Sequence, residues 1–474
     1  MPFIQDADIV VRELDQFFSQ SISGSEPVIN QERLEVIINE LDLATYVRSG
    51  GLTDRKLAAF LKKYLSYSTR LHHSHYFGHQ CAAPHYSGAL ASLVDGFINN
   101  PMAVYEMGPA AASVEYFVVN WMLEKVGWQP SSTNPYAENN RENSTGAGVL
   151  VNGGSLANLL ALLVARRKIQ PDVWQSGSNS DLAVMVSSES HYSIEKSAGI
   201  MGIGKNSVYQ LAVDERGAIL PDQLENTLNQ LVVDGKKPMI LVANACSTAL
   251  GIYDSLEPIA EFCQTHNIWF HVDAAHGAGA LLSEKHRDKL RGVVQADSII
   301  WDAHKMLQTP SLCAALLVKE RAFLDTAMHH DASYLFHDKE QPGFDFMPRT
   351  IECTKSALGT KFFFVLAALG ESGLSHYVDQ QCELAQQAYQ YIEEQPDLNC
   401  PVCPESNILC FRPEVDDATV LSIRDSLLKE RSFHLTSTVF NGKRYLRMVF
   451  MSPNSSLDDV RRLVERVRVL LTVE

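Results

Sequence analysis

The order of hydrophobic and polar residues divides this chain of 474 residues into three stretches of different pattern. Residues 1–65 alternate amphipathic helical segments with short polar breaks and predict an N-terminal helical segment. Residues 371–474 begin with a helical pattern and continue with short alternating strands and two further helices. We expect this last stretch to form a small C-terminal α+β domain.

The long middle stretch, residues 66–370, alternates hydrophobic strand-like runs with helical patterns. Four of these runs are GVLV, DLAVMVSS, PMILVAN and IWFHVDAA, and a helical pattern follows each of the first three. Strands that alternate with helices form βαβ units, so this stretch predicts an α/β domain with a mostly parallel central sheet covered by helices. In open sheets of this kind the ligand binds at the carboxyl ends of the strands.

A carboxylate and an amine follow two of the predicted strands. Asp273 ends one strand, and Lys305 comes shortly after the next, SIIWD. A lysine amine condenses with an aldehyde cofactor, and a carboxylate keeps a pyridine ring nitrogen protonated so that the ring draws electrons. Taken singly, Lys305 could be a surface lysine and Asp273 a helix cap. Together they favour a pyridine cofactor that carries an aldehyde.

Further polar residues follow the other strands of the middle stretch. Gly153, Gly154 and Ser155 precede a helix, where two glycines let the backbone approach a ligand and a hydroxyl suits a phosphate. The alternative is an ordinary glycine turn with a serine cap. The segment matches neither a Walker loop nor a GxGxxG fingerprint, which disfavours a nucleotide. His191 could stack on a planar ring or cap a helix, and Thr248 could bind a ring hydroxyl or a carboxylate or only form a turn.

Composition narrows the class of partner. A net charge of −16 and a pI near 5.5 argue against a general nucleic-acid or anionic-membrane surface. The sequence contains no hydrophobic run of the ~18–20 residues that span a bilayer, and its N-terminus does not resemble a signal peptide. Nine scattered cysteines suit reduced thiols in a cytoplasmic enzyme, and the lone CxxC at Cys400 and Cys403 is expected to pack rather than to bind a metal. We expect a small-molecule substrate and no metal, nucleic-acid or membrane partner.

Several motifs resemble those of a known family. These motifs are HVDAAHGAG, the DAHK that ends at Lys305, SSESHYSIEKSAG, LVNGGSLANLLAL, DASYLF and LRMVFMSP. They are similar in sequence, order and separation to motifs of the group II pyridoxal-phosphate-dependent amino-acid decarboxylases, from about residue 70 to the C-terminus. The resemblance implies the fold type I (aspartate aminotransferase-like) architecture, with 66–370 as the cofactor-binding domain. It also implies a homodimer whose active sites lie at the interface.

The resemblance implies a role for each matching residue around pyridoxal 5'-phosphate. Lys305 would bind the aldehyde, Asp273 would pair with the ring nitrogen, and His191 would stack on the ring. The remaining residues would surround the phosphate, the ring hydroxyl and the other ring face: Gly154, Ser155, Asp302, His304, Thr248 and Ala275. Asp302 is a departure, because several members carry Asn there and an acid beside a phosphate is unfavourable unless it points away.

The resemblance also implies α-decarboxylation of an L-amino acid to an amine and CO₂. Arg447, in LRMVFMSP, would bind a substrate carboxylate through its bidentate fork, and Gln80 matches a substrate-contacting glutamine of the glutamate-type members. These residues favour glutamate, aspartate or cysteine sulfinate. The alternative is a diamino acid such as 2,4-diaminobutyrate or lysine, for which Asp338, Glu340 and Asp345 could supply acidic groups. An aromatic substrate is less favoured.

One loop departs from the family pattern. In the glutamate and aromatic members a mobile loop supplies a tyrosine thought to donate a proton, whereas residues 337–350 contain no tyrosine. Alignment places Phe344 on or near that position, in contact with the substrate. Either His337, His304 or another group donates the proton, or oxygen diverts the carbanion to an aldehyde. A transaminase, a cysteine desulfurase and a catalytically silent homologue stay open as alternatives, and CO₂ release would separate decarboxylation from them.

Overall fold

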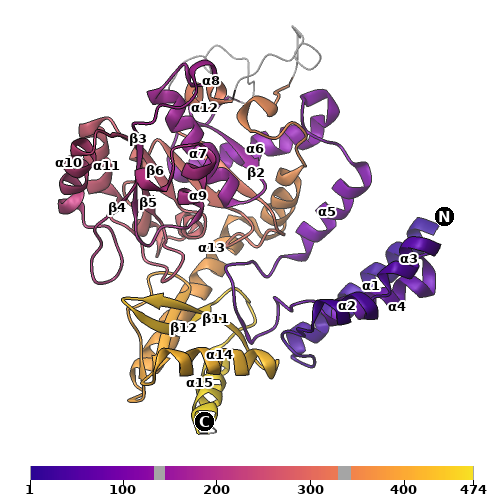
Figure 1. The fold of residues 1–474 in the computed structure, drawn as a ribbon. Coiled ribbons are helices and arrows are strands. Elements are labelled where there is room, and N and C mark those ends of the chain that lie inside the picture. Colours follow the sequence, from indigo (N-terminus) through magenta and orange to yellow (C-terminus); the bar gives the residue numbers. More distant parts are fainter. Residues whose placement is uncertain (1, 133–144, 329–342, 473–474) are drawn as a thin grey trace. The chain divides into compact units, whose positions relative to one another are not determined.

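The computed structural model describes residues 2–132, 145–328 and 343–472 (Figure 1). The chain folds as two compact units, of which unit 1 comprises Met1–Ala83 with Gln380–Glu474 and unit 2 comprises Pro84–Asp379. The N-terminal and C-terminal stretches were predicted as separate parts, but in the structure they belong to the same unit. Within this unit Arg431 Nη2 donates to Glu32 Oε1 at 2.7 Å, and Tyr76 and Phe77, from the start of the middle stretch, pair in parallel with His434 and Leu435.

Unit 2 is built on a seven-stranded sheet of order β2-β8-β7-β6-β5-β3-β4. Only β8 runs antiparallel to its neighbours in this sheet, so the predicted mostly parallel sheet is confirmed. The strands are β2 (Ala147–Val151), β3 (Leu182–Ser187), β4 (Val208–Leu211), β5 (Lys237–Asn244), β6 (Trp269–Asp273), β7 (Ser298–Asp302) and β8 (Ala314–Val318).

Helices cover both faces of this sheet (Figure 1). Alternate residues of each strand enter opposite cores, so that Ile240 packs toward α7, α9 and α12 while Leu241 packs toward α6, α10 and α11. The α-helices of unit 2 are α5 (Tyr86–Ile98), α6 (Pro109–Val126), α7 (Gly154–Ile169), α8 (Val173–Ser176), α9 (Ser193–Ile200), α10 (Leu224–Val233), α11 (Leu256–His266) and α12 (Arg321–Ala327). Short 3-10 helices occur at Tyr105–Met107, Lys205–Ser207, Pro221–Gln223, Gly277–Leu282, Arg287–Leu290, Val293–Gln295 and Met347–Arg349. Helix α13 (Leu358–Glu393) begins in unit 2 and ends in unit 1, with a non-helical residue at Gly370.

Strand β2 is an edge strand, and buried side chains satisfy its outward backbone groups. Glu115 Oε1 accepts the Leu150 N–H at 3.0 Å, and Arg349 Nη1 donates to the Gly148 carbonyl at 3.3 Å. Glu115 also forms an ion pair with Lys355, and both side chains are 0% exposed. The edge is thereby closed to another strand. These contacts fix the strand that leads directly into the glycine turn.

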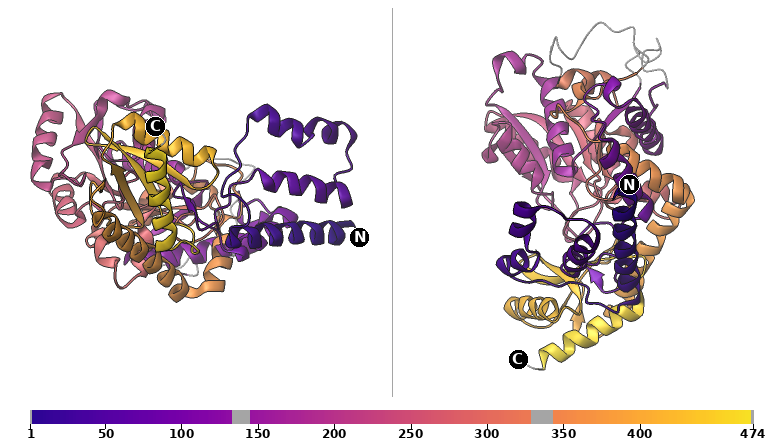
Figure 2. Two further views of the ribbon diagram at one scale, coloured as in Figure 1. Left: turned by 90° about the horizontal axis from the view of Figure 1, so that it is seen from below. Right: turned by 90° about the vertical axis from the view of Figure 1, so that its right-hand side faces the viewer.

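Unit 1 combines four N-terminal helices with a five-stranded sheet of order β1-β11-β12-β10-β9. Helix α1 packs against α4 (Figure 2). The predicted C-terminal strands and helices are present, together with two unpredicted strands, β9 and β11. The elements are α1 (Pro2–Ser23), α2 (Leu34–Glu40), α3 (Leu43–Ser49), α4 (Asp54–Ser66), β1 (Tyr76–Phe77), β9 (Leu398–Asn399), β10 (Ile408–Pro413), α14 (Asp417–Lys429), β11 (His434–Phe440), β12 (Lys443–Val449) and α15 (Leu457–Leu471).

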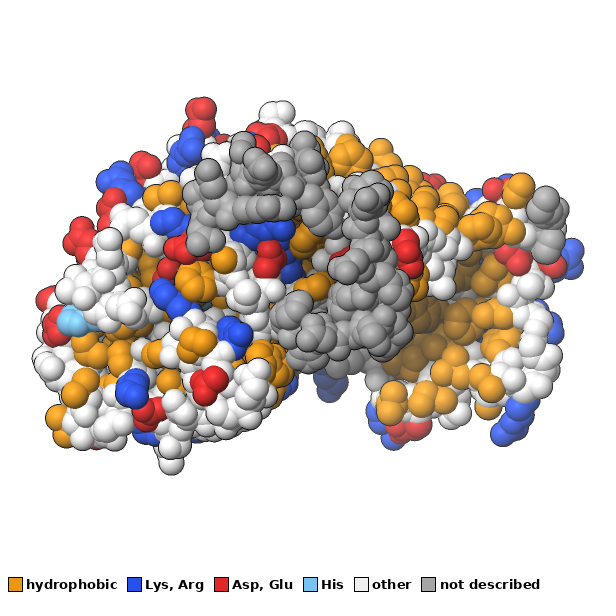
Figure 3. Space-filling model, turned by 90° about the horizontal axis from the view of Figure 1, so that it is seen from above, with side chains coloured by type: hydrophobic (Ala, Val, Ile, Leu, Met, Phe, Trp, Pro, Cys, Tyr) orange, Lys and Arg blue, Asp and Glu red, His pale blue; other side chains and the backbone are white. Residues whose placement is uncertain are grey.

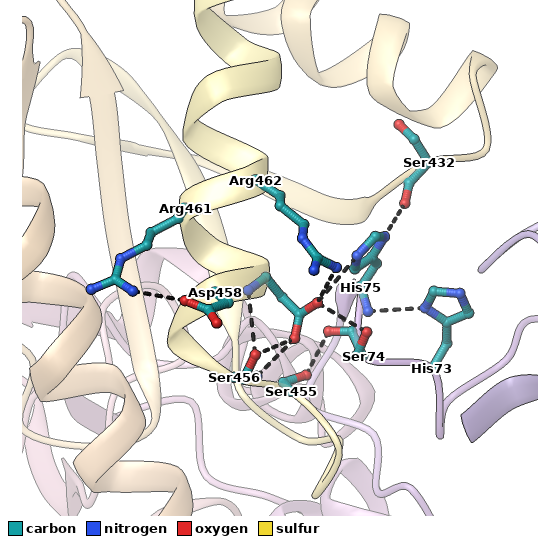
Figure 4. Close-up of polar contacts among 10 residues, drawn as sticks. His73, Ser74, His75, Ser432, Ser455, Ser456, Asp458, Arg461 and Arg462 are labelled. Carbon is teal, nitrogen blue, oxygen red and sulfur yellow. Dashed lines mark hydrogen bonds and ion pairs between the residues drawn. The ribbon is translucent and has the colours of Figure 1, made fainter. Parts of the chain in front are cut away.

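A polar cluster centred on Asp459 joins the two ends of the chain within unit 1 (Figure 4). Asp459 Oδ1 lies 3.3 Å from His75 Nε2 and accepts the Ser74 hydroxyl at 3.2 Å, while Ser456 and Asp459 form a capping box at the start of α15. The His75 ring stacks on Phe433, with centroids 4.1 Å apart. Side chains remote in sequence thus hold β1 next to the C-terminal sheet.

Candidate active site

A cavity of about 280 Å³ lies at the carboxyl ends of β2, β3, β5, β6 and β7, within unit 2. This volume is at the lower end of the ~300–1,000 Å³ that small-molecule sites occupy. The structure brings nine of the predicted site residues together in its lining, namely Lys305, Asp273, His191, Gly154, Ser155, Thr248, Ala275, Asp302 and His304. The ends of parallel strands meet at one edge of the sheet, which explains why residues from five separate loops converge.

The glycine turn forms one wall of the cavity. Gly153 is the N-cap of α7 and has a φ of +103°, a conformation that residues with a side chain rarely adopt. A Cβ on Gly154 would lie 2.9 Å from Asp302 Oδ2, so only glycine fits there without displacement. Because Gly153 has no side chain to cap the helix, the first N–H groups of α7 are available for an anion at the positive end of the helix dipole.

Lys305, Asp302 and His304 lie together after β7. Asp302 Oδ2 is 3.4 Å from Lys305 Nζ and 3.5 Å from His304 Nε2, and the Asp302 side chain is 2% exposed. Burial raises the pKa of Asp302, and the neighbouring Lys305 and His304 oppose that effect. Asp302 Oδ1 is buried and has no hydrogen-bond partner among the residues described. The carboxylate therefore faces two groups that offset its charge.

Asp273, at the end of β6, and His191, after β3, approach the cavity from two strands that are separated by β5 in the sheet. Asp273 Oδ2 accepts a hydrogen bond from Asn158 Nδ2 at 2.9 Å, and its Oδ1 accepts the Ala275 N–H at 3.3 Å. His191 Nδ1 lies 2.8 Å from Ser193 Oγ. Burial lowers the pKa of His191, with Asp273 opposing, so the ring is held in its neutral form.

The other three predicted site residues are not among those that line this cavity within unit 2. Gln80 and Arg447 belong to unit 1, where Arg447 lies in β12 and is 7% exposed. Phe344 lines a second cavity of unit 2, of about 410 Å³, with its ring 5.9 Å from Tyr116 and 4.2 Å from the Arg349 guanidinium. The contacts that were predicted between these three residues and the substrate stay predictions. His337, Asp338 and Glu340 lie outside the described residues.

Sequence reasoning missed Asn158, which lines the cavity, and His271, which contacts Asn158. Asn158 interrupts the apolar run LANLLALL, and His271 interrupts the strand WFHVD. Each is at most 1% exposed, and they contact one another between His271 Nε2 and Asn158 Oδ1 at 3.0 Å. A polar residue inside an apolar run was the available signal, because a buried polar group requires a partner.

The cavity supplies the groups that pyridoxal phosphate requires. The Lys305 amine, the fixed Asp273 carboxylate and the uncapped start of α7 match an aldehyde, a ring nitrogen and a phosphate respectively. The buried, unpartnered Asp302 Oδ1 also indicates that the cavity is built for polar contacts with a ligand. The residues present therefore fit this cofactor.

Comparisons with known proteins agree with this chemistry. The family described as the pyridoxal-dependent decarboxylase conserved domain matches residues 54–414. Acidic amino acid decarboxylase from Homo sapiens is 29% identical over 489 residues, which cover 99% of this chain and 90% of that protein. Cysteine sulfinic acid decarboxylase from Homo sapiens is 31% identical over 406 residues, which cover 84% of this chain and 78% of that protein.

Solved structures share the whole fold. The crystal structure of mouse CSAD matches with a TM-score of 0.87 at 26% identity, over 97% of this chain and 98% of that chain. The glutamate decarboxylase domain of a Vibrio parahaemolyticus protein, diaminobutyrate-pyruvate transaminase and L-2,4-diaminobutyrate decarboxylase, has the same fold, with a TM-score of 0.85 at 20% identity over 100% of this chain and 96% of that chain. The fold type I architecture and the resemblance predicted from sequence are confirmed. The chain belongs to the pyridoxal-dependent decarboxylase family, and its cofactor is pyridoxal 5'-phosphate.

Proposed function

We propose that this decarboxylase acts on an acidic L-amino acid and converts it to the corresponding amine and CO₂. The observation that carries the proposal is the convergence of Lys305, Asp273 and the glycine turn on one cavity. The choice of substrate is supported by two relatives whose names specify acidic amino acids and cysteine sulfinic acid. Glutamate, aspartate and cysteine sulfinate are therefore the proposed substrates.

The residues of the cavity are assigned roles by their chemistry. Bound pyridoxal phosphate supplies an aldehyde for the substrate amine and a ring that accepts the electron pair left when CO₂ departs. Lys305 is proposed to hold that aldehyde covalently between turnovers. Asp273 would keep the ring nitrogen protonated, and His191 would lie against the ring in its neutral form. The backbone at Gly154 would bind the phosphate.

Proton return to the substrate carbon is assigned to Lys305 Nζ. Asp302 Oδ2, 3.4 Å away, would orient this amine. His304 Nε2, 3.5 Å from the same oxygen, is the second candidate donor. The Lys305 side chain is 19% exposed, so few water molecules compete for the proton. This assignment requires no loop tyrosine.

The alternative of a diamino acid rests on acidic loop residues. Among these, Asp345 accepts the backbone N–H of Tyr105 through Oδ1 at 2.7 Å. A carboxylate that is held by a backbone group is a weaker anchor for a substrate ammonium. The acidic substrate is therefore favoured.

A panel of amino acids, each supplied alone, tests the proposal by the CO₂ and amine released. We expect the highest kcat/KM for glutamate, aspartate or cysteine sulfinate, with one amine for each CO₂. Aldehyde and peroxide would be measured in the same reactions, and amine at full stoichiometry would contradict diversion by oxygen. A preference for a diamino acid would contradict the proposed substrate class, and turnover without CO₂ would contradict decarboxylation.

Arg447 gives a second test of the substrate class. We propose that its guanidinium binds a carboxylate or sulfinate of the substrate. Arg447→Lys keeps the charge but loses the fork, so KM for the acidic substrate should rise about 10-fold. Arg444→Lys on the same strand is the matched control, because Arg444 Nη1 instead bonds Ser437 Oγ at 3.0 Å. Equal effects of the two substitutions would contradict the role of Arg447.

We also propose a homodimer in the cytoplasm. Hydrophobic side chains reach the surface (Figure 3), and Leu90, Leu93, Val94 and Ile98 form one face of α5 with 44–50% exposure each. A continuous apolar face of this kind fits a protein interface. Light scattering should give twice the chain mass of 52.7 kDa, and Leu93→Asp should shift it toward the single chain. No disulfide joins the nine cysteines, all of which lie in the described residues; this suits a reducing compartment, and cell fractionation tests the location.

The residues that the structure describes were also searched for a membrane-spanning helix and for a metal site. Among the helices of the described residues, none has the length and hydrophobicity that a membrane span requires. Over the same residues, no group of three or more His, Cys, Asp or Glu side chains is arranged to hold a metal ion.

A further inference from the structure

A chain of buried hydrogen bonds runs from the sheet interior to the carboxylate behind the cofactor cavity. Trp269 Nε1 donates to Ser298 Oγ at 2.8 Å, and Ser298 Oγ lies 2.8 Å from His271 Nδ1. His271 Nε2 lies 3.0 Å from Asn158 Oδ1, and Asn158 Nδ2 donates to Asp273 Oδ2 at 2.9 Å. Four of these side chains are at most 2% exposed, Asp273 is 8% exposed, and both Asp273 and Asn158 line the cavity.

The positions of the protons in this chain are determined by its two ends. Indole N–H can only donate, so Ser298 Oγ accepts that hydrogen, and its own proton stays available for His271 Nδ1. Burial lowers the pKa of His271 to about 4, so the ring is neutral and its single proton lies on Nε2. This proton is donated to Asn158 Oδ1, which turns the amide NH₂ toward Asp273. The Asp273 carboxylate at the other end can only accept, so Asn158 turns its NH₂ toward Asp273 and its Oδ1 toward His271. Asn158 Oδ1 can only accept in turn, so the proton of the His271 ring again lies on Nε2.

The same amide also orders the histidine on the cofactor side. Asn158 Nδ2 has two hydrogens, and the second is donated to Ser193 Oγ at 3.0 Å. Ser193 Oγ then donates its own proton to His191 Nδ1 at 2.8 Å, which also accepts the Ser193 N–H at 3.3 Å. One amide therefore fixes both the acceptor state of Asp273 and the tautomer of His191.

We propose that Asn158, with its amide orientation locked by His271, is a positioning residue that holds Asp273 as a fixed, ionised acceptor for the ring nitrogen of pyridoxal phosphate. A hydrogen bond to a carboxylate stabilises its charged form. Without the lock, the amide can rotate and turn its oxygen toward Asp273, which would disfavour the charge. The inference depends on the cofactor and is independent of which amino acid is the substrate.

The test compares two ligands in titrations of the apoenzyme. One is pyridoxal phosphate, and the other is its analogue with carbon in place of the ring nitrogen, which has no proton for Asp273 to hold. Asn158→Leu and His271→Leu should weaken pyridoxal phosphate binding about 10-fold while changing the affinity for the analogue by less than about twofold. A tenfold change corresponds to ~1.4 kcal/mol, the size expected for one hydrogen bond.

Three controls separate positioning from general loss of structure. Ser193→Ala removes the other partner of the Asn158 amide but leaves the bond to Asp273, so the preference for pyridoxal phosphate should persist. His271→Gln can donate to Asn158 and accept from Ser298, so it should restore the preference that His271→Leu loses. Thermal unfolding of each apoenzyme verifies that it is folded; if Asn158→Leu is not, the two His271 variants decide the outcome.

Equal weakening of both ligands by Asn158→Leu or His271→Leu would overturn the proposal, as would unchanged affinity for both. Failure of the wild-type protein to bind pyridoxal phosphate would instead contradict the cofactor itself. The two failures are therefore distinguishable in the same titrations.

Discussion

The buried ion pair between Glu115 and Lys355 yields a prediction about the stability of unit 2. Both side chains are 0% exposed, and Glu115 Oε1 also accepts the Leu150 N–H of the edge strand. Burial raises the pKa of Glu115, and the Lys355 ammonium opposes this effect. In the variant Lys355→Met the carboxyl group is buried without its cation. Its pKa therefore rises further, and the folded protein takes up a proton.

The size of the effect and its pH dependence follow from these contacts. Removal of one partner of a buried ion pair costs about 3–5 kcal/mol. Glu115 of the variant has a raised pKa when folded and the ordinary value of 4.5 when unfolded, so above pH 4.5 the folded state binds the extra proton. The stabilisation of the folded variant by the proton on Glu115 is fully present below pH 4.5. It falls by about 1.4 kcal/mol per pH unit as the pH rises toward the folded pKa.

Thermal unfolding of the apoenzyme at pH 6 and pH 8 is the assay. For domains of 150–250 residues, a loss of 1 kcal/mol lowers the unfolding midpoint by about 2–4 °C. Lys355→Met should therefore lower the midpoint by at least about 6 °C at pH 8 and by less at pH 6. The double variant Glu115→Gln/Lys355→Met carries neither charge and is the matched control, so its deficit should be the same at both pH values. A deficit of Lys355→Met that is also independent of pH would refute the reasoning.

Gly154→Ala should weaken pyridoxal phosphate binding because its Cβ would lie 2.9 Å from Asp302 Oδ2; Gly199→Ala, whose Cβ meets nothing within 4 Å, should bind normally in the same titration. Burial alone would raise the pKa of Asp459, but hydrogen bonds from His75, Ser456 and Ser74 lower it to about 2. At ~1.4 kcal/mol per pKa unit, Asp459→Asn should cost about 2 kcal/mol at pH 7, and in acid titrations that deficit should disappear as the pH falls from 3.8 toward 2. Phe344→Tyr should leave the ratio of amine to aldehyde unchanged, because Phe344 lines the second cavity of unit 2; a changed ratio would instead support the predicted contact of Phe344 with the substrate.

Much of the fold could be predicted because hydrophobic periodicity reports local structure. The runs that predict β3, β5 and β6 are buried on both faces, as strands of a helix-covered parallel sheet are. Strand β11 was missed because its middle, Thr436–Ser437–Thr438, is polar and gives no continuous strand pattern. Its pairing with Tyr76 and Phe77 joins residues more than 300 positions apart, and nothing local in the sequence specifies such a partner.

Part of the site could be predicted because the carboxyl ends of parallel strands meet at one edge of the sheet. This rule placed Lys305, Asp273 and His191 together without any knowledge of contacts. It could not reveal Asn158 or His271, because the importance of a buried polar residue depends on which partner lies opposite. The position of Phe344 depends on the path of a loop, which alignment to a motif does not determine.

We propose that Lys305 carries the cofactor in the cavity at the carboxyl ends of the strands. Borohydride reduction of the cofactor-loaded enzyme would make the link between cofactor and lysine permanent, and mass spectrometry of the digested protein would locate it. We expect the added phosphopyridoxyl mass on the peptide that contains Lys305, and none after reduction of Lys305→Ala. The mass on another lysine, or an unmodified Lys305 in a fully active enzyme, would refute the role of Lys305.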